Sequence, residues 1–278
     1  SQEGRFRNND LERTFDTVRD IVSVANAARN VAALKRRWPV SEVLVCGPAL
    51  DALEKMDGIS DVLKTQLNAE QYSIVEIPSE TQLGKVTGLV EKKMPVEVTI
   101  SLIRRNVAPK VKADIGKVSE AFERADRAEM LALLASKGTF GLAYERGGGE
   151  ASSVELVPSD LDIAYKAGAG YAASERDGLV VFVSTRRDRE LTAKGLLRDL
   201  ARRLQQLRKE RGFMPSEVLG TAYAAGLSED EISMLSPLKD ELKYLVRVRQ
   251  ASLSAEPDPK VNYSQVELDG REFLLSVE

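Results

Sequence analysis

The longest amphipathic segment of the chain lies at residues 189–211. Its apolar side chains recur at three- and four-residue steps, the spacing of one helical face, and Gly212 follows as a stop. The apolar stripe consists of Ala193, Leu196, Leu197, Leu200, Leu204 and Leu207. This pattern predicts a long helix that packs one face on a core.

A similar periodicity at the start of the chain predicts a helix over residues 10–37, with Asn9 as its cap and Pro39 as its stop. Its carboxyl end is basic, because it carries Arg29, Lys35, Arg36 and Arg37. Cations in a last turn suit the helix dipole, so the cluster indicates either a stable helix end or a phosphate contact.

Between residues 41 and 138 the pattern changes to alternating strands and helices. Residues 42–46 and 72–77 are strand-sized apolar runs, and residues 96–103 alternate at period two. A basic loop is expected next, followed by helices over 115–124 and 126–136. The cations of that loop are Arg104, Arg105, Lys110 and Lys112.

From residue 140 the chain reads as short strands separated by Gly and Asp turns, which an antiparallel sheet explains most simply. Strands are expected at 141–144, 154–157, 161–164, 170–173 and 179–184. A strand at 216–223 and a helix at 228–249, capped by Ser228 with Glu231, follow the long helix. Two final strands, 261–268 and 271–277, pair across Asp269-Gly270.

These elements predict an α/β to α+β fold, in which an N-terminal helical arm leads into mixed sheets packed by long amphipathic helices. We divide it into a junction at 1–40, a first α/β subdomain at 41–138 and a second α+β subdomain at 139–278, which contains the long helix and the C-terminal hairpin.

Composition removes several kinds of chemistry. The 278 residues include no histidine, which excludes Ser–His–Asp and Cys–His catalysis. Cys46 is the only cysteine, so no internal disulfide or thiolate zinc cage can form, and we expect it to be a small buried side chain. The Gly147–Gly149 run lacks the Gly-Lys-Ser/Thr of a phosphate loop and is expected to be a turn.

The charge balance and hydropathy bear on partners and location. The formal net charge is -3, which argues against nonspecific coating of nucleic acid and for local basic sites. The apolar runs are far shorter than the roughly 18 residues that span a bilayer, and the N-terminus lacks a signal peptide. We expect a cytoplasmic protein without a membrane or DNA partner. Because the chain starts at Ser1, we also expect it to be a trimmed piece.

Residues 190–213 resemble a long helix near the end of isoleucyl-tRNA synthetases, with the pattern Leu-Thr, Glu-Gly-Leu-Ala-Arg, Arg-x-x-Gln-x-x-Arg-Lys and Gly-Phe. Gly195 and Arg198 match the earlier half, and Arg203, Gln206, Arg208 and Lys209 match the later half in type, with Leu207 between Gln206 and Arg208. Lys194 replaces the usual acid before the glycine. Residues 27–29 and 35–45 are similar to the family's passage from its anticodon-binding bundle into the terminal domain. Residues 107–116 match more loosely.

This resemblance covers nearly the whole chain and implies a part of the synthetase that does no chemistry itself. The parent enzyme would activate isoleucine with ATP and Mg²⁺ in a nucleotide-binding fold upstream of Ser1, so no cofactor is expected in this piece. Its partners would be the anticodon arm of tRNA(Ile) and the rest of the synthetase. The lone Cys46 implies that the zinc module of some family members is missing.

In that reading, basic side chains contact tRNA phosphates and fix the anticodon arm. The junction cluster of Arg29 and Lys35–Arg37 is the first candidate, followed by the cations at 104–112. On the long helix, Arg198, Arg202, Gln205, Arg208 and Lys209 lie off the leucine stripe and form either a phosphate-facing edge or a solvated face.

Two other hypotheses remain open from the sequence. A protein-interaction or scaffolding module would dock the synthetase body or an assembly partner, and RNA binding would differ from it by a steep salt dependence. An independent enzyme would need paired carboxylates, which nothing in the sequence indicates. Aromatic side chains are few, and Trp38, Tyr72, Tyr144 and Tyr223 are expected to be packing residues rather than base platforms.

Overall fold

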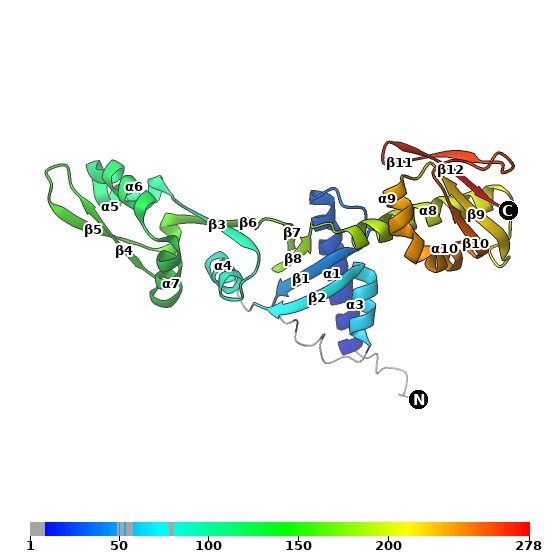
Figure 1. The fold of residues 1–278 in the computed structure, drawn as a ribbon. Coiled ribbons are helices and arrows are strands. Elements are labelled where there is room, and N and C mark those ends of the chain that lie inside the picture. Colours follow the sequence, from blue (N-terminus) through cyan, green and yellow to red (C-terminus); the bar gives the residue numbers. More distant parts are fainter. Residues whose placement is uncertain (1–8, 49, 51–52, 54–57, 78–80) are drawn as a thin grey trace, which may run out of the picture. The chain divides into compact units, whose positions relative to one another are not determined.

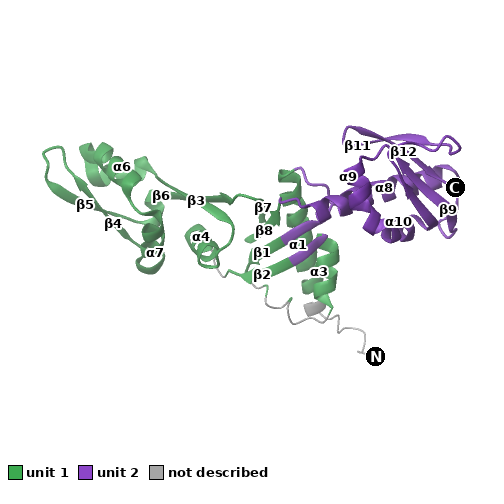
Figure 2. Ribbon diagram, viewed as in Figure 1, with its two compact units in different colours: residues 1–32, 43–67, 72–184 green, residues 33–42, 68–71, 185–278 purple. Residues whose placement is uncertain are grey.

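The computed structural model describes residues 9–48, 50, 53, 58–77 and 81–278 (Figure 1). Its chain divides into two compact units (Figure 2). Unit 1 comprises Ser1–Ala32, Val43–Leu67 and Tyr72–Ser184, and unit 2 comprises Ala33–Glu42, Asn68–Gln71 and Thr185–Glu278. Helices and mixed sheets make up both units, so the α/β class expected from the sequence is confirmed.

The first sheet has the strand order β2-β1-β8-β7, and helix α1 packs on its β7 and β8 strands. All six residues of β8 are buried, because α1 covers one face and side chains such as Ile77 and Leu89 cover the other. Strands β1 and β8 pair antiparallel, with Leu44 opposite Phe182. The elements are α1 (Asn9–Val31), β1 (Val40–Gly47), α3 (Ile59–Leu67), β2 (Ala69–Glu76), β7 (Tyr171–Arg176) and β8 (Leu179–Ser184).

A second core in unit 1 gathers two antiparallel strand pairs, β3 with β6 and β4 with β5, against four helices. Phe122 and Met130 are fully buried at its centre. The elements are α4 (Gln82–Glu91), β3 (Val96–Leu102), α5 (Arg104–Val111), η1 (Lys112–Asp114), α6 (Ile115–Arg124), α7 (Arg127–Lys137), β4 (Phe140–Glu145), β5 (Ala151–Leu156), η2 (Pro158–Asp160) and β6 (Leu161–Ala167). The single sheet expected from residue 140 onward is therefore wrong, because its strands join three sheets. The subdomain boundary expected near residue 138 falls inside unit 1.

Unit 2 is built around α8 (Arg189–Glu210), the long helix that the leucine stripe predicted. Leu197, Leu200 and Leu204 are fully buried against a sheet of order β10-β9-β12-β11, and burying each contributes about 2 kcal/mol. The other elements are β9 (Leu219–Ala225), α9 (Glu229–Leu235), η3 (Ser236–Leu238), α10 (Lys239–Val246), β10 (Val248–Leu253), β11 (Ser264–Leu268) and β12 (Arg271–Val277). The Asp269-Gly270 hairpin and the Ser228–Glu231 capping box are confirmed.

Two helices differ from the expected ones because a residue adopts a left-handed backbone. Helix α1 ends at Val31 and not at Arg37, and Ala33 has a φ of 53°, which a right-handed helix cannot include. The helix expected at 228–249 splits at Pro237 and ends at Val246, because Arg247 has a φ of 55°. The parallel strand β10, which follows, was missed.

The basic loop expected at residues 104–112 is also wrong, because most of it forms helix α5. Val107 and Val111 are four residues apart and both buried, so the segment has an apolar helical face despite its cations. Lys112 ends the helix with a φ of 52°.

Candidate nucleic-acid interface

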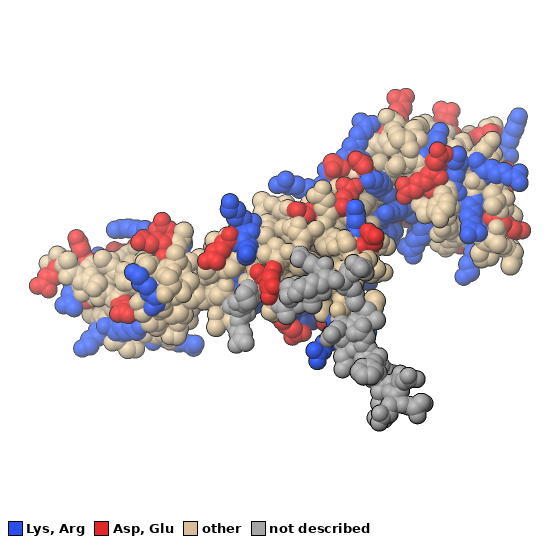
Figure 3. Space-filling view, turned by 90° about the horizontal axis from the view of Figure 1, so that it is seen from below, with Lys and Arg blue, Asp and Glu red and all other residues tan. Residues whose placement is uncertain are grey.

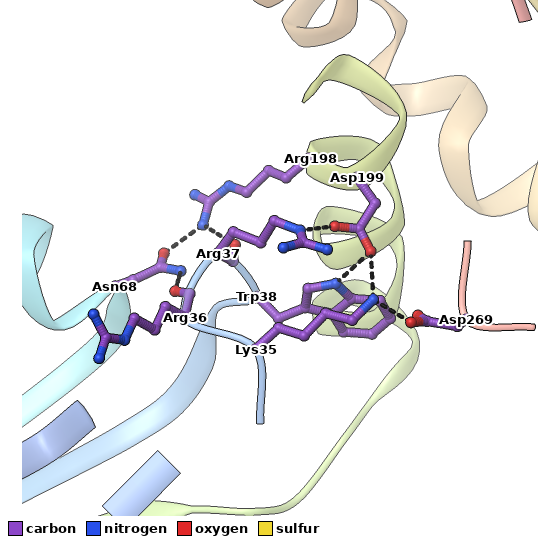
Figure 4. Close-up of polar contacts among 8 residues, drawn as sticks. All are labelled: Lys35, Arg36, Arg37, Trp38, Asn68, Arg198, Asp199 and Asp269. Atoms are coloured by element: carbon purple, nitrogen blue, oxygen red, sulfur yellow. Dashed lines mark hydrogen bonds and ion pairs between the residues drawn. The ribbon is translucent and has the colours of Figure 1, made fainter. Parts of the chain in front are cut away.

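The junction cations and α8 meet at the carboxylate of Asp199, whose side chain is 1% exposed (Figure 4). Lys35 Nζ and Trp38 Nε1 each donate to its Oδ2 at 2.9 Å, and Arg37 Nε donates to its Oδ1. Lys35 also pairs with Asp269 of the C-terminal hairpin. Lys35 and Arg37 are therefore held inside unit 2, and their charges are already compensated.

Trp38 fixes this arrangement by packing on α8 at Gly195. A Cβ atom added at Gly195 would lie 2.3 Å from the indole ring, so only glycine admits the ring at this distance. The guanidinium of Arg187 lies 5.1 Å from the ring centroid and donates to Pro39 O at 2.8 Å. Trp38 is thus a packing residue, as the sequence predicted.

The protonation equilibrium of Asp199 reflects these contacts. Burial by itself would raise the pKa of this carboxyl, but hydrogen bonds from Arg37, Trp38 and Lys35 outweigh burial and hold the pKa below its ordinary value. The carboxylate therefore remains ionised and is the structural counter-ion of Lys35 and Arg37.

Arg36 differs from its two neighbours. Its backbone carbonyl accepts a hydrogen bond from Asn68 Nδ2 at 3.0 Å, and Asn68 Oδ1 in turn accepts from Arg198. Arg198 also donates to Arg37 O at 3.1 Å. In Figure 4 the Arg36 side chain points away from Asp199, and among the described residues it has no ion-pair partner. The backbone of Arg36 is fixed while its guanidinium is exposed.

Arg208 was expected on a phosphate-facing edge, and the structure places it inside the protein instead. The residue is 6% exposed, and its guanidinium donates to four backbone carbonyls. The acceptors are Val246 O, Arg247 O at 3.3 Å, Met214 O at 3.1 Å and Glu217 O at 2.7 Å. Arg208 joins the end of α10 to the loop after α8 and has no surface for a phosphate.

The exposed edge of α8 carries Arg202 and Lys209. Between them, Gln205 Nε2 donates to Leu245 O at 2.8 Å and so belongs to the contact with α10. Within the described part of the chain, neither Arg202 nor Lys209 pairs with an acid. Of the α8 residues expected to face RNA, these two present an open cation.

Arg29 is a further correction. It lies on α1 in unit 1, is 2% exposed, and donates from its guanidinium to Leu67 O at 2.9 Å. A buried arginine held at the end of α3 cannot reach a phosphate.

Helix α5 of unit 1 and its C-cap residue Lys112 carry four cations of two kinds. Lys110 pairs with the buried Asp160 and donates to Glu155 O at 3.2 Å. Arg104, Arg105 and Lys112 are exposed and make no ion pair with any described residue. Two arginines in a first turn without an acid oppose the helix dipole, so they do not serve the stability of α5.

Over the face drawn in Figure 3, cations and acids are interspersed, and no expanse of one sign dominates. This agrees with the net charge of -3. No group of three or more metal-ligating side chains occurs among the described residues, and each helix described is too short or too polar to cross a bilayer.

Sequence reasoning missed Asp199 as the partner of the junction cations. A signal was available, because Asp199 follows Gly195 by one helical turn in the very segment that carried the resemblance. It also missed Tyr244, which is 82% exposed on α10. Tyr244 falls opposite the buried Leu242 and Val246 in the helical repeat, and the periodicity alone would have placed it on the surface.

No protein-family model matches the chain. An isoleucine–tRNA ligase of Methanosarcina barkeri is 29% identical over 252 residues, which cover 90% of this chain and 22% of that protein. One of Saccharolobus islandicus is 24% identical over 276 residues, with 98% of this chain and 24% of that protein covered. One of Thermoplasma volcanium is 26% identical over 202 residues, with 72% and 17% covered.

The chain thus spans about a fifth of the length of the curated relatives it matches. The resemblance drawn from residues 190–213 and 29–45 is confirmed, and the chain is related, over nearly all its length, to one part of the isoleucine–tRNA ligases.

Proposed function

We propose that this chain is a tRNA-contacting, non-catalytic part of an isoleucine–tRNA ligase, which positions tRNA(Ile) through its anticodon arm for aminoacylation elsewhere in the ligase. The observation that carries the proposal is the division of unit 2 cations into two classes. Lys35, Arg37 and Arg208 are used inside the fold, whereas Arg36, Arg202 and Lys209 are exposed without an acidic partner among the described residues.

Exposed, unpaired cations on a rigid support are suited to phosphates. Each phosphate contact releases condensed counterions, so affinity depends steeply on salt even when the protein as a whole is anionic. Such contacts carry little sequence information but fix register and orientation. In a synthetase this orientation would bring the distant acceptor end of the tRNA to the site of chemistry.

Three carboxylates with lowered pKa values support a structural and not a catalytic role for the chain. Burial opposes ionisation of Glu231 and Glu175, but hydrogen bonds from Arg271 and Lys85, respectively, outweigh it and hold both pKa values low. Asp199 follows the same pattern. General acids at neutral pH need a raised pKa, and these three groups have the opposite shift. ATP and Mg²⁺ would belong to the catalytic domain of the ligase.

Charge reversal at Arg36 is the direct test. Arg37→Glu is unsuitable, because it would place a second carboxylate against Asp199 and disturb the fold. Arg36→Glu changes only an exposed guanidinium, and we expect it to weaken binding of an isoleucine tRNA transcript about tenfold in gel shifts at low salt, with a shallower salt dependence.

Lys64→Glu is the matched control, since Lys64 is an exposed lysine on α3, outside the proposed surface. Equal tRNA affinity of the wild type, Arg36→Glu and Lys64→Glu would contradict the proposal. In the full ligase, Arg36→Glu should slow tRNA aminoacylation while isoleucyl-adenylate formation, followed by pyrophosphate exchange, remains unchanged.

A further inference from the structure

Tyr244 is the most exposed of the large hydrophobic side chains in the described part of the protein, at 82%. It lies on α10, whose buried positions Leu242 and Val246 face the core of unit 2. A single exposed aromatic residue is ordinary on a protein surface. What surrounds Tyr244 is therefore decisive.

Two further exposed apolar side chains, Met214 and Val218, belong to the same region of unit 2, at 61% and 57% exposure. The Arg208 guanidinium brings them there, because it binds the carbonyls of Met214 and Glu217 and also those of Val246 and Arg247. In addition, Leu219 N donates to Arg247 O at 3.1 Å, which sets Val218 beside Arg247. The end of α10 and the segment after α8 are thus held side by side, and both carry exposed apolar side chains.

Cations without acidic partners among the described residues lie on these segments and next to them in the chain. Arg247 is held at the end of α10 by its left-handed backbone, with its N–H bonded to Tyr244 O at 3.3 Å. Lys209 follows Arg208 on α8, and Arg249 is exposed on the edge strand β10. None of the three pairs with an acid among the described residues.

The nearby acids are mostly engaged within the protein. Glu217 accepts the Met214 N–H at 2.7 Å, and Asp240 pairs with Lys243 at 2.5 Å. Glu241, one turn before Tyr244, is an exposed exception. The neighbourhood of Tyr244 therefore contains an exposed aromatic ring, two exposed apolar side chains and three open cations, with Glu217 and Glu241 as its remaining acids.

We propose that Tyr244 is a stacking platform for an unpaired nucleobase of RNA, with Arg247 and Lys209 receiving the phosphates on either side. This inference rests on the proposed function and adds to it the subsite that grips a splayed nucleotide. Sequence-tolerant RNA binding commonly joins aromatic stacking to a basic track, because every base presents a π face. Met214 and Val218 would pack against the edge of the stacked nucleotide.

The test compares Tyr244→Ala, Tyr244→Phe and the control Phe15→Ala, which removes a half-exposed aromatic ring on α1. Labelled isoleucine tRNA, single-stranded oligouridylate and an RNA duplex serve as probes in fluorescence anisotropy. We expect Tyr244→Ala to weaken binding of tRNA and of oligouridylate by about 5- to 150-fold, with the duplex unaffected. Tyr244→Phe and Phe15→Ala should match the wild type.

A second measurement reports stacking itself. Tyr244→Trp should show tryptophan fluorescence quenched by oligouridylate, above the baseline from Trp38 in the wild type. If the wild type binds tRNA and Tyr244→Ala binds it equally well, the stacking site is wrong and the proposed function stands. If the wild type fails to bind tRNA but oligouridylate quenches Tyr244→Trp, the stacking site stands and the proposed function is wrong.

If the wild type does not bind tRNA and oligouridylate does not quench Tyr244→Trp, both proposals are overturned. Unchanged RNA binding by Tyr244→Ala, together with a loss of concentration-dependent self-association in sedimentation, would assign the surface to a protein contact and also overturn the stacking site.

Discussion

Arg208 and Lys209 are consecutive residues in the segment that most resembles the synthetases, yet their side chains have opposite environments. Arg208 is buried and donates to the carbonyls of two separate segments, whereas Lys209 is exposed and unpaired among the described residues. The same contrast separates Arg37, bound to Asp199, from Arg36. A match to a family motif therefore identifies a domain, and only the three-dimensional contacts separate its structural cations from its open ones.

The physical reason lies in the donor geometry of arginine. A planar guanidinium with five N–H donors can satisfy several carbonyls at once, which a lysine ammonium on a flexible stem cannot do in the same geometry. Arg208 uses this capacity at the end of α10, where the last carbonyls of a helix have no intrahelical partner. Structural arginines and RNA-binding arginines are thus chemically alike and differ only in what they face.

The largest loss of stability is expected from Arg208→Met. This change keeps the apolar stem but removes every donor to the four carbonyls, and it should lower the free energy of unfolding by about 3–5 kcal/mol. Urea denaturation of the full chain followed by circular dichroism measures it. Arg208→Lys should recover only part of the lost stability. If Arg208→Met had the same denaturation midpoint as the wild type, Arg208 would not be the structural arginine that the contrast with Lys209 requires.

The elements predicted from periodicity were largely confirmed where one face alone is buried. The leucine stripe of α8, the alternation of β3 and the Asp269-Gly270 hairpin are each determined by local spacing. The failures were at positions where backbone conformation and not side-chain pattern decides, such as Ala33 and Arg247, both with positive φ. Neither alanine nor arginine signals a left-handed conformation, so no sequence rule could have found these two ends.

Sheet membership was also beyond the sequence. The strands after residue 140 have similar patterns, but β6 pairs with β3, and β8 pairs with β1. These partners are set by the packing of distant cores. The candidate site shows the same limit, since spacing placed Arg202 and Lys209 off the leucine stripe, where both are exposed, but could not reveal that Arg29 and Arg208 are buried. Burial depends on which segments meet, such as α1 with Leu67.

A smaller loss of stability is expected when the carboxylate of Asp199, which binds Lys35 and Arg37, is removed. Its folded pKa lies below the unfolded value of about 3.9, so its contribution is complete above that pH and is lost as the pH falls through the folded pKa. Asp199→Asn should cost about 2–4 kcal/mol near pH 7. The difference from the wild type should shrink below about pH 4.

Denaturation of both proteins at a series of pH values checks this. Because Glu231 also has a lowered pKa, Glu231→Gln is the matched control that separates Asp199 from acid effects elsewhere. A difference between the wild type and Asp199→Asn that stays constant down to acidic pH would show that the carboxylate charge is not what holds the two cations.

The smallest effects on stability are expected from Arg202→Ala and Arg203→Ala. These two variants should differ instead in how tRNA affinity depends on salt. Arg202 is exposed without an acidic partner in the described part of the chain, whereas Arg203 donates to Gln206 Oε1 at 3.2 Å. Either change to alanine should alter the free energy of unfolding by less than about 0.5 kcal/mol, since neither guanidinium is buried. Only Arg202→Ala should reduce the slope of log affinity for tRNA against log salt, by roughly 0.7–0.9, the value for one lost phosphate contact. If both variants gave the same slope of log affinity against log salt, exposure on α8 would not distinguish the cations that contact RNA from those that do not.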